Sequence, residues 1–419
     1  MKILFVNKFY YMAGGQEFYL RELQEILTAN GHEIIPFAME HPRNWETPYS
    51  KYFVRRIDIS STDAPGLIDK VRMPFRLIYS REARQKLDAL IRATRPDIAH
   101  IYSVNYQLTP SVMYALKEHG IPVVNTVNEY KLVCPNQRLF VQHTGENCEL
   151  CLGSNYRRAV SKRCIKDSLG ASIVGAVESR IYDSLGTFRD NVDAFIVATD
   201  YMREVLEGVR IRPEKVVKIL HPLRLTDYKP DYTDDGYVLY FGRLSGEKGL
   251  KTLIRAFRGL DVPLKLMGEG PDTEELKAMV RDWGMDNVEF LGFRQGAELR
   301  RVIARSRLVV CPSEWYENSP YVVYESLATG KPVIGSSIKG GIPELVKDGK
   351  DGFLFRPMDP DDLREKVRRL YYDEGMVGMM GRYARKYAED NFGEDASYRN
   401  FMALYERVIK THGRGKGAA

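Results

Sequence analysis

The chain has 419 residues, enough for about two domains of ordinary size. Hydrophobic residues make up 44% of it and charged residues 28%, which is typical of a globular protein with a sizeable core. A net charge of +6 is too weak a bias for a dedicated nucleic-acid binder, and no apolar run approaches the roughly 18 residues needed to span a bilayer. We therefore expect a soluble cytoplasmic protein that binds no nucleic acid.

In the first half of the chain, short apolar runs alternate with amphipathic stretches. Because the apolar runs are continuous, they indicate parallel strands buried on both faces. Strands are predicted at 2–6, 32–38, 97–102, 121–127 and 193–199, and helices at 16–31 and 110–120. Gly14 and Gly15 stand between the first strand and the first helix, where either a phosphate-binding glycine loop or a plain turn fits the sequence.

The same pattern begins again near residue 236, after a polar, proline-punctuated segment. Strands are predicted at 236–242, 263–270, 288–293 and 307–313, and helices at 248–260, 272–284 and 298–306. Two parallel sheets in tandem predict an α/β protein with two Rossmann-like domains facing a cleft. The predicted units are a first domain at 1–215, a second at 216–390, a last helix at 391–410 and a disordered tail at 411–419.

The first strand of the second domain runs into a loop with two cations. Arg243 offers a planar fork of donors, and Lys248 follows five residues later as a mobile point charge. Gly242, Gly246 and Gly249 would let the backbone approach a ligand closely. At a helix N-terminus such cations would hold a diphosphate. The alternative is a solvated basic loop, because short glycine-rich motifs are weak evidence on their own.

Two glutamates, Glu317 and Glu325, follow the strand at 307–313 with a spacing of eight residues. Pro320 suits the first turn of a helix, with Asn318 or Ser319 as its cap. Eight helical residues rise about 12 Å, comparable to the separation between the hexose and the ribose of a sugar nucleotide. One carboxylate would accept hydrogen bonds from the sugar and the other from the ribose. Two exposed glutamates on a charged helix are the alternative.

Five motifs occur in order along the second half: FGRLSGEKGL, LMGEGP, VEFLGF, CPSEWYENSPYVVYESLATGKPVIGS and GGIPELVKDGKDGFLF. Together they resemble glycosyltransferase family 4, the glycosyl transferases of group 1, which are retaining enzymes of the GT-B fold. The resemblance runs from the N-terminal glycine loop to the last helix. It implies two Rossmann-like domains facing a cleft, with the C-terminal helix crossing back onto the first domain.

The resemblance also implies a role for each matching residue. Arg243 and Lys248 would bind the donor diphosphate, Glu317 would contact the transferred sugar, and Glu325 the ribose. Arg243, Lys248 and Glu317 would be the catalytic residues, and the stretch 292–294 would hold the base. The full donor-binding set implied is Gly14, Gly15, Arg243, Lys248, Gly268, Phe293, Glu317, Asn318, Ser319 and Glu325.

The chain departs from the family pattern at two places. The family often has E-G-F-G after the first glutamate, whereas this chain has E-N-S-P, and Pro320 lacks the N–H of one backbone donor to the sugar. Relatives commonly have H-x-H where this chain has His100 and Tyr102. We expect His100 to be a core residue, since a mid-strand histidine is usually satisfied internally. The acceptor-side candidates are Tyr102, Asn128 and Glu129.

The resemblance implies transfer of a sugar from a UDP- or GDP-sugar to a glycan or lipid-linked acceptor, in cell-surface polysaccharide or glycolipid assembly. In this family the leaving phosphate can take the acceptor's proton, so no catalytic cofactor or metal is expected. Two alternatives remain open. A sugar-nucleotide epimerase can share the GT-B architecture, and a non-catalytic relative could bind nucleotide sugar as a scaffold.

Four of the five cysteines fall in one stretch, which we interpret as an insertion at 134–166 near the cleft. Their spacing is C-x13-C-x2-C-x12-C. A structural zinc site and free or redox-active thiols are both compatible with one C-x2-C pair, and disulfides are the least expected in a reducing cytoplasm. The four candidate zinc ligands are Cys134, Cys148, Cys151 and Cys164.

A basic stretch at 70–95 interleaves cations with aromatic and apolar residues. It could lie on an anionic membrane surface and make the protein peripheral at the inner membrane face. The alternative is a solvated helix, because charge runs usually face water.

Overall fold

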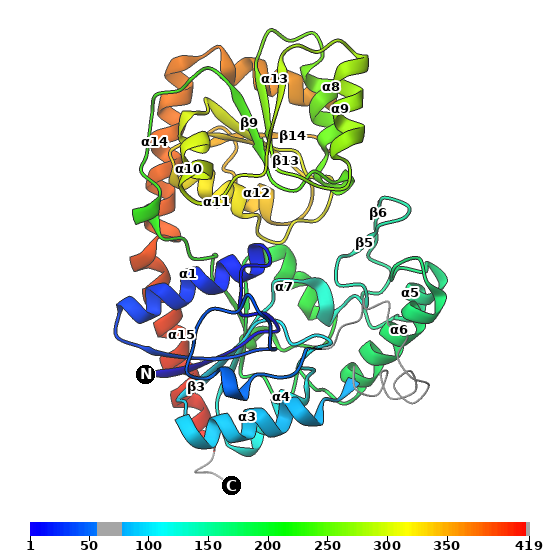
Figure 1. Cartoon of the computed structure of the whole chain (residues 1–419), viewed down its shortest axis with the longest axis vertical. Helices are drawn as coiled ribbons and strands as arrows, with labels where there is room; N and C mark the ends of the chain where they lie inside the picture. Colours follow the sequence, from blue (N-terminus) through cyan, green and yellow to red (C-terminus); the bar gives the residue numbers. More distant parts are fainter. Residues whose placement is uncertain (57–77, 416–419) are drawn as a thin grey trace.

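The structure is a computed structural model, and it describes residues 1–56 and 78–415. Two α/β halves stack one above the other in Figure 1, the N-terminal half below and the C-terminal half above. Each half is built around a parallel sheet with helices on both of its faces. The continuous apolar strands explain this, since their side chains are buried on either side.

The sheet of the first domain has the strand order β2-β1-β3-β4-β7-β8 among the described residues. Its strands are β1 (Lys2–Val6), β2 (Glu33–Phe37), β3 (Ile98–Ile101), β4 (Val123–Thr126), β7 (Ala194–Val197) and β8 (Val216–Lys218). Its helices are α1 (Gly15–Ala29), α3 (Arg81–Thr94), α4 (Ser111–Glu118), α6 (Leu169–Ser184) and α7 (Asp200–Glu207). The predicted boundary at 215 was wrong by one strand, because β8 pairs with β7 and belongs to the first sheet.

The sheet of the second domain has the order β11-β10-β9-β12-β13-β14. Its strands are β9 (Val238–Phe241), β10 (Leu264–Met267), β11 (Val288–Gly292), β12 (Leu308–Cys311), β13 (Val333–Ser336) and β14 (Gly352–Phe355). Its helices are α8 (Leu250–Phe257), α9 (Thr273–Asp282), α10 (Gly296–Arg305), α11 (Tyr321–Ala328), α12 (Gly341–Leu345) and α13 (Pro360–Tyr371). Single 3-10 turns lie at Ser50–Tyr52, Tyr130–Leu132, Pro213–Lys215, Leu225–Asp227 and Gly246–Lys248.

The last two helices, α14 (Glu374–Asn391) and α15 (Glu394–Gly415), run from the second domain down to the first, as predicted (Figure 1). The apolar face of α15 packs on the first sheet through Phe401 and Tyr405. His100 is a core residue, as expected. Its two ring nitrogens form hydrogen bonds of 2.7 Å with the hydroxyl groups of Tyr405 and Thr126. Residues 411–415 continue the helix, so the predicted disordered tail was wrong for them; 416–419 lie outside the described residues.

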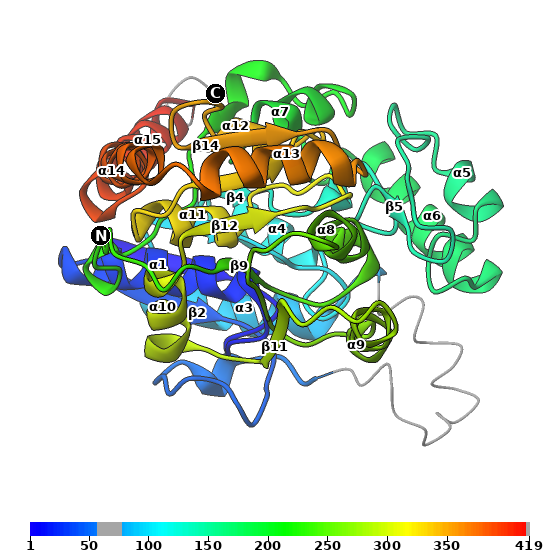
Figure 2. The same cartoon turned by 90° about the horizontal axis from the view of Figure 1, so that it is seen from above.

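The cysteine-rich insertion forms a separate lobe of the first domain. It contains the hairpin of β5 (Phe140–Val141) and β6 (Glu146–Asn147) and the short helix α5 (Arg157–Ser161), which packs against α6. In Figure 2 this lobe lies on the side opposite to α14 and α15. The hairpin stands close to the second domain, which matters for the site described below.

Only part of the basic stretch at 70–95 belongs to the described residues, since 70–77 lie outside them. Its remainder forms α3, whose apolar side chains Leu87, Leu90 and Ile91 are buried in the core. These side chains therefore cannot meet a membrane, and the described part is a solvated helix with a buried apolar face. Among the described residues, no helix is both long enough and apolar enough to cross a membrane.

Candidate active site

A cleft of about 630 Å³ lies between the two domains, at the carboxyl ends of the strands. All ten residues predicted to bind the donor line it. They are Gly14, Gly15, Arg243, Lys248, Gly268, Phe293, Glu317, Asn318, Ser319 and Glu325. Residues about 300 positions apart in the chain thus meet in one cavity, which is large enough for a small-molecule ligand.

Two helices start at the cleft without a side chain capping them. Gly14 precedes α1 and gives no cap, and Pro320 precedes α11 with no side-chain hydrogen bond to its first turn. Asn318 and Ser319 were predicted as caps, and that was wrong: Ser319 bonds the hydroxyl of Tyr324 at 2.7 Å, and Asn318 turns toward the first domain. Because neither cap residue bonds the first turn through a side chain, the starts of both helices favour an anionic ligand in the cleft.

The two cations differ in their surroundings. Arg243 is exposed and forms no ion pair with any described residue. Lys248 donates to Glu317 at 2.5 Å, and Ser313 donates to the same carboxylate oxygen at 3.1 Å. Burial alone would lower the pKa of Lys248, but the charge and the hydrogen bond of Glu317 outweigh it, so the pKa is raised. Arg243 is thus a free cation in the cleft, and Lys248 a cation already paired.

Two glycines beside the cleft, one on this loop and one after β10, are required by the packing of the backbone. Gly249 has φ of 71°, and a Cβ there would lie 2.0 Å from the carbonyl oxygen of Pro312. Gly268 likewise has φ of 140°, with the carbonyl of Gly242 at 1.9 Å from its Cβ position. Both positions exclude a side chain because of the neighbouring strand ends. We predicted that Gly249 would let a ligand approach the backbone. The structure shows instead that glycine is needed there because two loops pack closely.

Glu325 is buried on α11 and accepts a hydrogen bond of 2.7 Å from Tyr228. Burial raises the pKa of its carboxyl group to about 7, in spite of this bond. Glu317 lies in the loop before the helix, because α11 begins only at Tyr321. The predicted rise of about 12 Å over eight helical residues was therefore wrong, since only the second half of that segment is helical.

The pKa of Glu325 predicts a pH dependence of ligand binding. A ribose hydroxyl donates better to the ionised carboxylate, so nucleotide affinity should rise as pH increases from about 6 to about 8, by roughly tenfold. The effect on stability has the opposite sign. Because the pKa of Glu325 is higher in the folded protein than in the unfolded chain, its protonated form stabilises the fold at low pH, and this stabilisation is lost as pH rises to about 7. Calorimetric titration with UDP checks the first effect. Glu325→Gln should remove the pH dependence, and an unchanged profile in that variant contradicts the assignment.

The loop that carries Glu317 is held by the insertion of the first domain. Trp315 donates its indole N–H to the backbone carbonyl of Arg138 at 2.6 Å. Asn147 of the hairpin donates to the carbonyl of Glu314 at 2.8 Å. The motif pattern could not show this contact, because the partners lie about 170 residues apart. The insertion therefore positions the Glu317 loop from across the domain boundary.

Tyr102 does not line the cleft, contrary to the prediction. Its ring is buried and stacks on Tyr19, with ring centres 4.9 Å apart. Its hydroxyl accepts a hydrogen bond from Asn128, whose own carbonyl oxygen accepts from Asn318 at 3.0 Å. Tyr102 thus orients a cleft residue instead of contacting a ligand itself. Asn128 links the first domain directly to the loop after Glu317.

A second cavity of about 450 Å³ adjoins the cleft and shares Gln16, Asn128, Trp315 and Asn318 with it. Glu129 lines this second cavity. The remaining lining side chains include amides and aromatic rings: Tyr106, Tyr130, Asn136, Gln137, Phe140 and Gln142. Amides and aromatic faces are the groups that bind sugar hydroxyls and sugar rings, so the second cavity provides room for another substrate.

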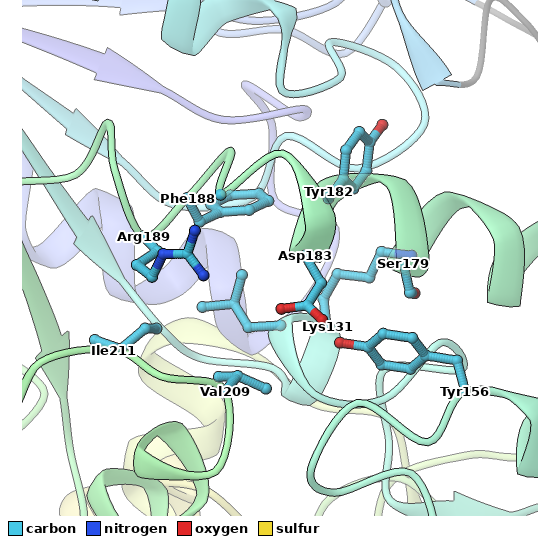
Figure 3. A pocket seen from close by; sticks show the side chains of 11 residues that line it. Lys131, Tyr156, Ser179, Tyr182, Asp183, Phe188, Arg189, Val209 and Ile211 are labelled. Atoms are coloured by element: carbon cyan, nitrogen blue, oxygen red, sulfur yellow. The ribbon is translucent and has the colours of Figure 1, made fainter.

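Another cavity, shown in Figure 3, lies within the first domain and contains no residue predicted for the site. Its volume is about 40 Å³, which is room for one or two water molecules. Lys131, at its wall, is buried and pairs with Glu178 at 2.6 Å. The pairing satisfies both charges inside the domain, and the cavity is too small for a sugar nucleotide.

The four insertion cysteines form no disulfide and lie near one another. Burial raises the pKa of Cys151 to about 12 and that of Cys164 to about 11, and the neighbouring cysteines add to both shifts. Among the described residues, no three His, Cys, Asp or Glu side chains are arranged to hold a metal ion. Cys311 is buried in the core of the second domain. This arrangement favours free thiols, and a zinc site in the insertion stays a prediction.

Metal analysis of the purified protein separates these alternatives. The zinc hypothesis expects about one zinc ion per chain, lost in the double variant Cys148→Ser, Cys151→Ser, because four thiolates are needed to complete the tetrahedral site. Cys311→Ser is the matched control and should keep the metal. If the protein is purified without chelator and contains no zinc, the zinc hypothesis is contradicted.

Comparison with known proteins gives two matching family models. Residues 14–219 match the "Glycosyl transferase 4-like domain", and residues 227–387 match "Glycosyl transferases group 1". Spore coat protein SA of Bacillus subtilis is 26% identical over 249 residues, which is 52% of this chain and 66% of that protein. The alignments with the curated relatives span between 24% and 66% of those proteins.

Two solved structures show the same arrangement of domains. Sucrose-phosphate synthase from Thermosynechococcus elongatus has a TM-score of 0.70 at 20% identity, covering 98% of this chain and 99% of its own. HepE of Anabaena, in complex with UDP and glucose, has a TM-score of 0.65 at 19% identity, covering 97% of this chain and all of its own. With two family models that follow one another along the chain and this shared GT-B fold, the protein belongs to the group 1, family 4-like glycosyltransferases.

Proposed function

We propose that this chain is a retaining glycosyltransferase that moves a sugar from a nucleotide-diphosphate donor to a glycan or lipid-linked acceptor. One observation carries the proposal: Arg243, Lys248, Glu317 and Glu325 line a single cleft into which two uncapped helices open. Cations and helix starts suit a diphosphate, and the carboxylates suit hydroxyl groups at the two ends of the donor. The proposed setting is cell-surface polysaccharide or glycolipid assembly.

The proposed donor is a UDP-sugar, with a GDP-sugar as the alternative. The structure of HepE that resembles this chain contains UDP and glucose, and a related structure of TarM contains UDP and a GlcNAc-glycerol. These ligands support a uridine nucleotide as the donor, because both proteins share the fold of this chain. Phe293 is exposed at the end of β11, where an aromatic ring can pack on a base.

The proposed chemistry needs positioning and charge stabilisation more than a side-chain base. As the bond between the sugar and the phosphate breaks, negative charge grows on the phosphate oxygens. Arg243, Lys248 and the start of α1 face that charge across the cleft. The departing oxygen takes the proton of the acceptor hydroxyl on the same face of the sugar, so configuration is retained. Glu317 holds the transferred sugar and keeps Lys248 in place.

The acceptor is proposed to enter through the second cavity. Asn128 lies between the two cavities, and Glu129 accepts hydrogen bonds from Ser103 at 3.3 Å and Gln16 at 3.4 Å. This carboxylate is therefore fixed in place, with its position beside the donor cleft suited to orient an acceptor hydroxyl. A cavity of this size next to the donor favours transfer over epimerisation, which needs no second substrate.

The test uses purified protein and donors labelled in the sugar. A thermal-shift screen against UDP, GDP, ADP and their sugars first identifies the nucleotide. Incubation with the matching labelled sugar nucleotide should then yield transfer to an acceptor, or slow hydrolysis when no acceptor is present. Formation of an epimer would instead support the epimerase, and binding with neither hydrolysis nor transfer would support the scaffold.

A further inference from the structure

Helix α6 exposes a line of large apolar side chains. Leu169, Ile173 and Val177 are spaced four residues apart, so they lie on one face of the helix. Their exposed fractions are 51%, 44% and 48%, and Val174 beside them is also exposed. The opposite face of α6 packs into the protein through Ala176 and Ser179. The exposed line is therefore not part of the core. Exposed apolar surface of this kind usually marks a site of interaction.

Exposed cations lie on α5, which packs against α6, and on the segment that follows it. Arg157, Arg158, Arg163 and Lys166 are exposed, and none of them forms an ion pair with a described residue. Lys162 pairs with Glu146 at 3.4 Å, and Arg180 on α6 pairs with Asp183 at 4.0 Å. Residues 157–180 carry six cations but only two carboxylates, Asp167 and Glu178, and Glu178 is buried against Lys131, so this part of the surface has a local excess of positive charge.

The cations and the apolar side chains meet at a groove of about 590 Å³ between α5 and α6. Val160, Ile173 and Val177 line it, and Arg157 and Arg180 lie beside them. An apolar groove bordered by arginines suits a molecule with a hydrocarbon part and an anionic head. The neighbouring segment 164–166 also lines the second cavity, so this surface leads toward the proposed acceptor site.

We propose that this surface, formed by α5, α6 and the segment 157–166, docks the protein on an anionic lipid bilayer. The apolar line would enter the boundary between headgroups and acyl chains, and the four unpaired cations would contact lipid phosphates. This surface replaces the stretch at 70–95 as the membrane-facing element, because the apolar side chains of α3 are buried. Membrane docking is independent of the proposed sugar transfer, since it needs no donor.

The test is co-sedimentation of the full-length protein with vesicles at low salt. Vesicles of phosphatidylcholine and phosphatidylglycerol in equal parts should bind it, and vesicles of phosphatidylcholine alone should not. Each cation near an anionic surface contributes about fivefold, so the triple variant Arg157→Gln, Arg158→Gln, Arg163→Gln should bind about a hundredfold more weakly. The double variant Ile173→Ser, Val177→Ser should weaken binding at least tenfold.

Matched controls come from exposed residues of the second domain. Met379→Ser removes an exposed apolar side chain from α14, and Arg301→Gln removes an exposed cation from α10; both should bind vesicles like the unchanged protein. All altered residues are exposed, so the melting temperature should not change. The proposal is overturned if the unchanged protein ignores anionic vesicles, if the variants bind equally well, or if the surface variants instead convert a dimer to a monomer.

Discussion

Glu317→Gln should reduce kcat/KM for sugar transfer about a thousandfold, with the affinity for UDP alone nearly unchanged. The carboxylate is buried in the cleft, and it would accept hydrogen bonds from the transferred sugar that are strongest in the transition state. The amide also removes the charge that holds Lys248 at 2.5 Å, so the cation would no longer be fixed beneath the phosphate. Steady-state kinetics with saturating acceptor, together with calorimetric titration of UDP, separates the two effects.

Glu314→Gln is the matched control, because Glu314 lies three residues earlier on the same loop. Its carboxylate accepts from Thr252 at 2.6 Å and does not line the cleft. This variant should keep most of its activity. Equal losses in both variants would mean that the loop had merely been disturbed, and near-normal turnover of Glu317→Gln would remove the carboxylate from the mechanism.

Arg243→Gln should weaken UDP binding and lower kcat/KM about a hundredfold, which corresponds to about 2.7 kcal/mol. Its guanidinium group is exposed in the cleft without an ion pair among the described residues, so it is free to form a forked bond with phosphate oxygens. Titration with UDP and with uridine separates the contribution of the diphosphate to affinity from that of the nucleoside. The affinity for uridine should not change.

Arg243→Lys and Arg258→Gln complete the experiment. Lysine keeps the charge but loses the planar fork, so it should recover only part of the affinity. Arg258 packs over the ring of Trp283 outside the cleft, and its replacement should leave UDP binding unchanged. If Arg243→Gln binds UDP as tightly as the unchanged protein, the diphosphate does not lie where we place it.

The sequence alone predicts the frame of the donor cleft. Continuous apolar runs reveal most strands of both sheets, and a strand end followed by glycines and a helix marks where a ligand would lie. This rule selected Arg243, Lys248, Glu317 and Glu325, which the structure brings together from segments about 80 residues apart. Local pattern suffices here because these residues follow neighbouring strands of one parallel sheet.

Contacts between distant segments could not be predicted in this way. Tyr102 appeared to face the acceptor because of its place in a family motif, but its ring is buried and its hydroxyl reaches Asn128. Ser319 has the side chain of a helix cap, yet Tyr324 offers a better partner within the fold. The bond between Trp315 and the insertion depends on how the two domains meet. Side-chain partners of this kind follow from tertiary packing, and periodicity does not encode them.

The most direct test of the central proposal is a crystal structure of the protein with a bound UDP-sugar. The account predicts that the diphosphate lies within hydrogen-bonding distance of Arg243 and of the first N–H groups of α1, with the ribose at Glu325 and the sugar at Glu317. A donor bound elsewhere, or a cleft in which these side chains point away from the nucleotide, would contradict it.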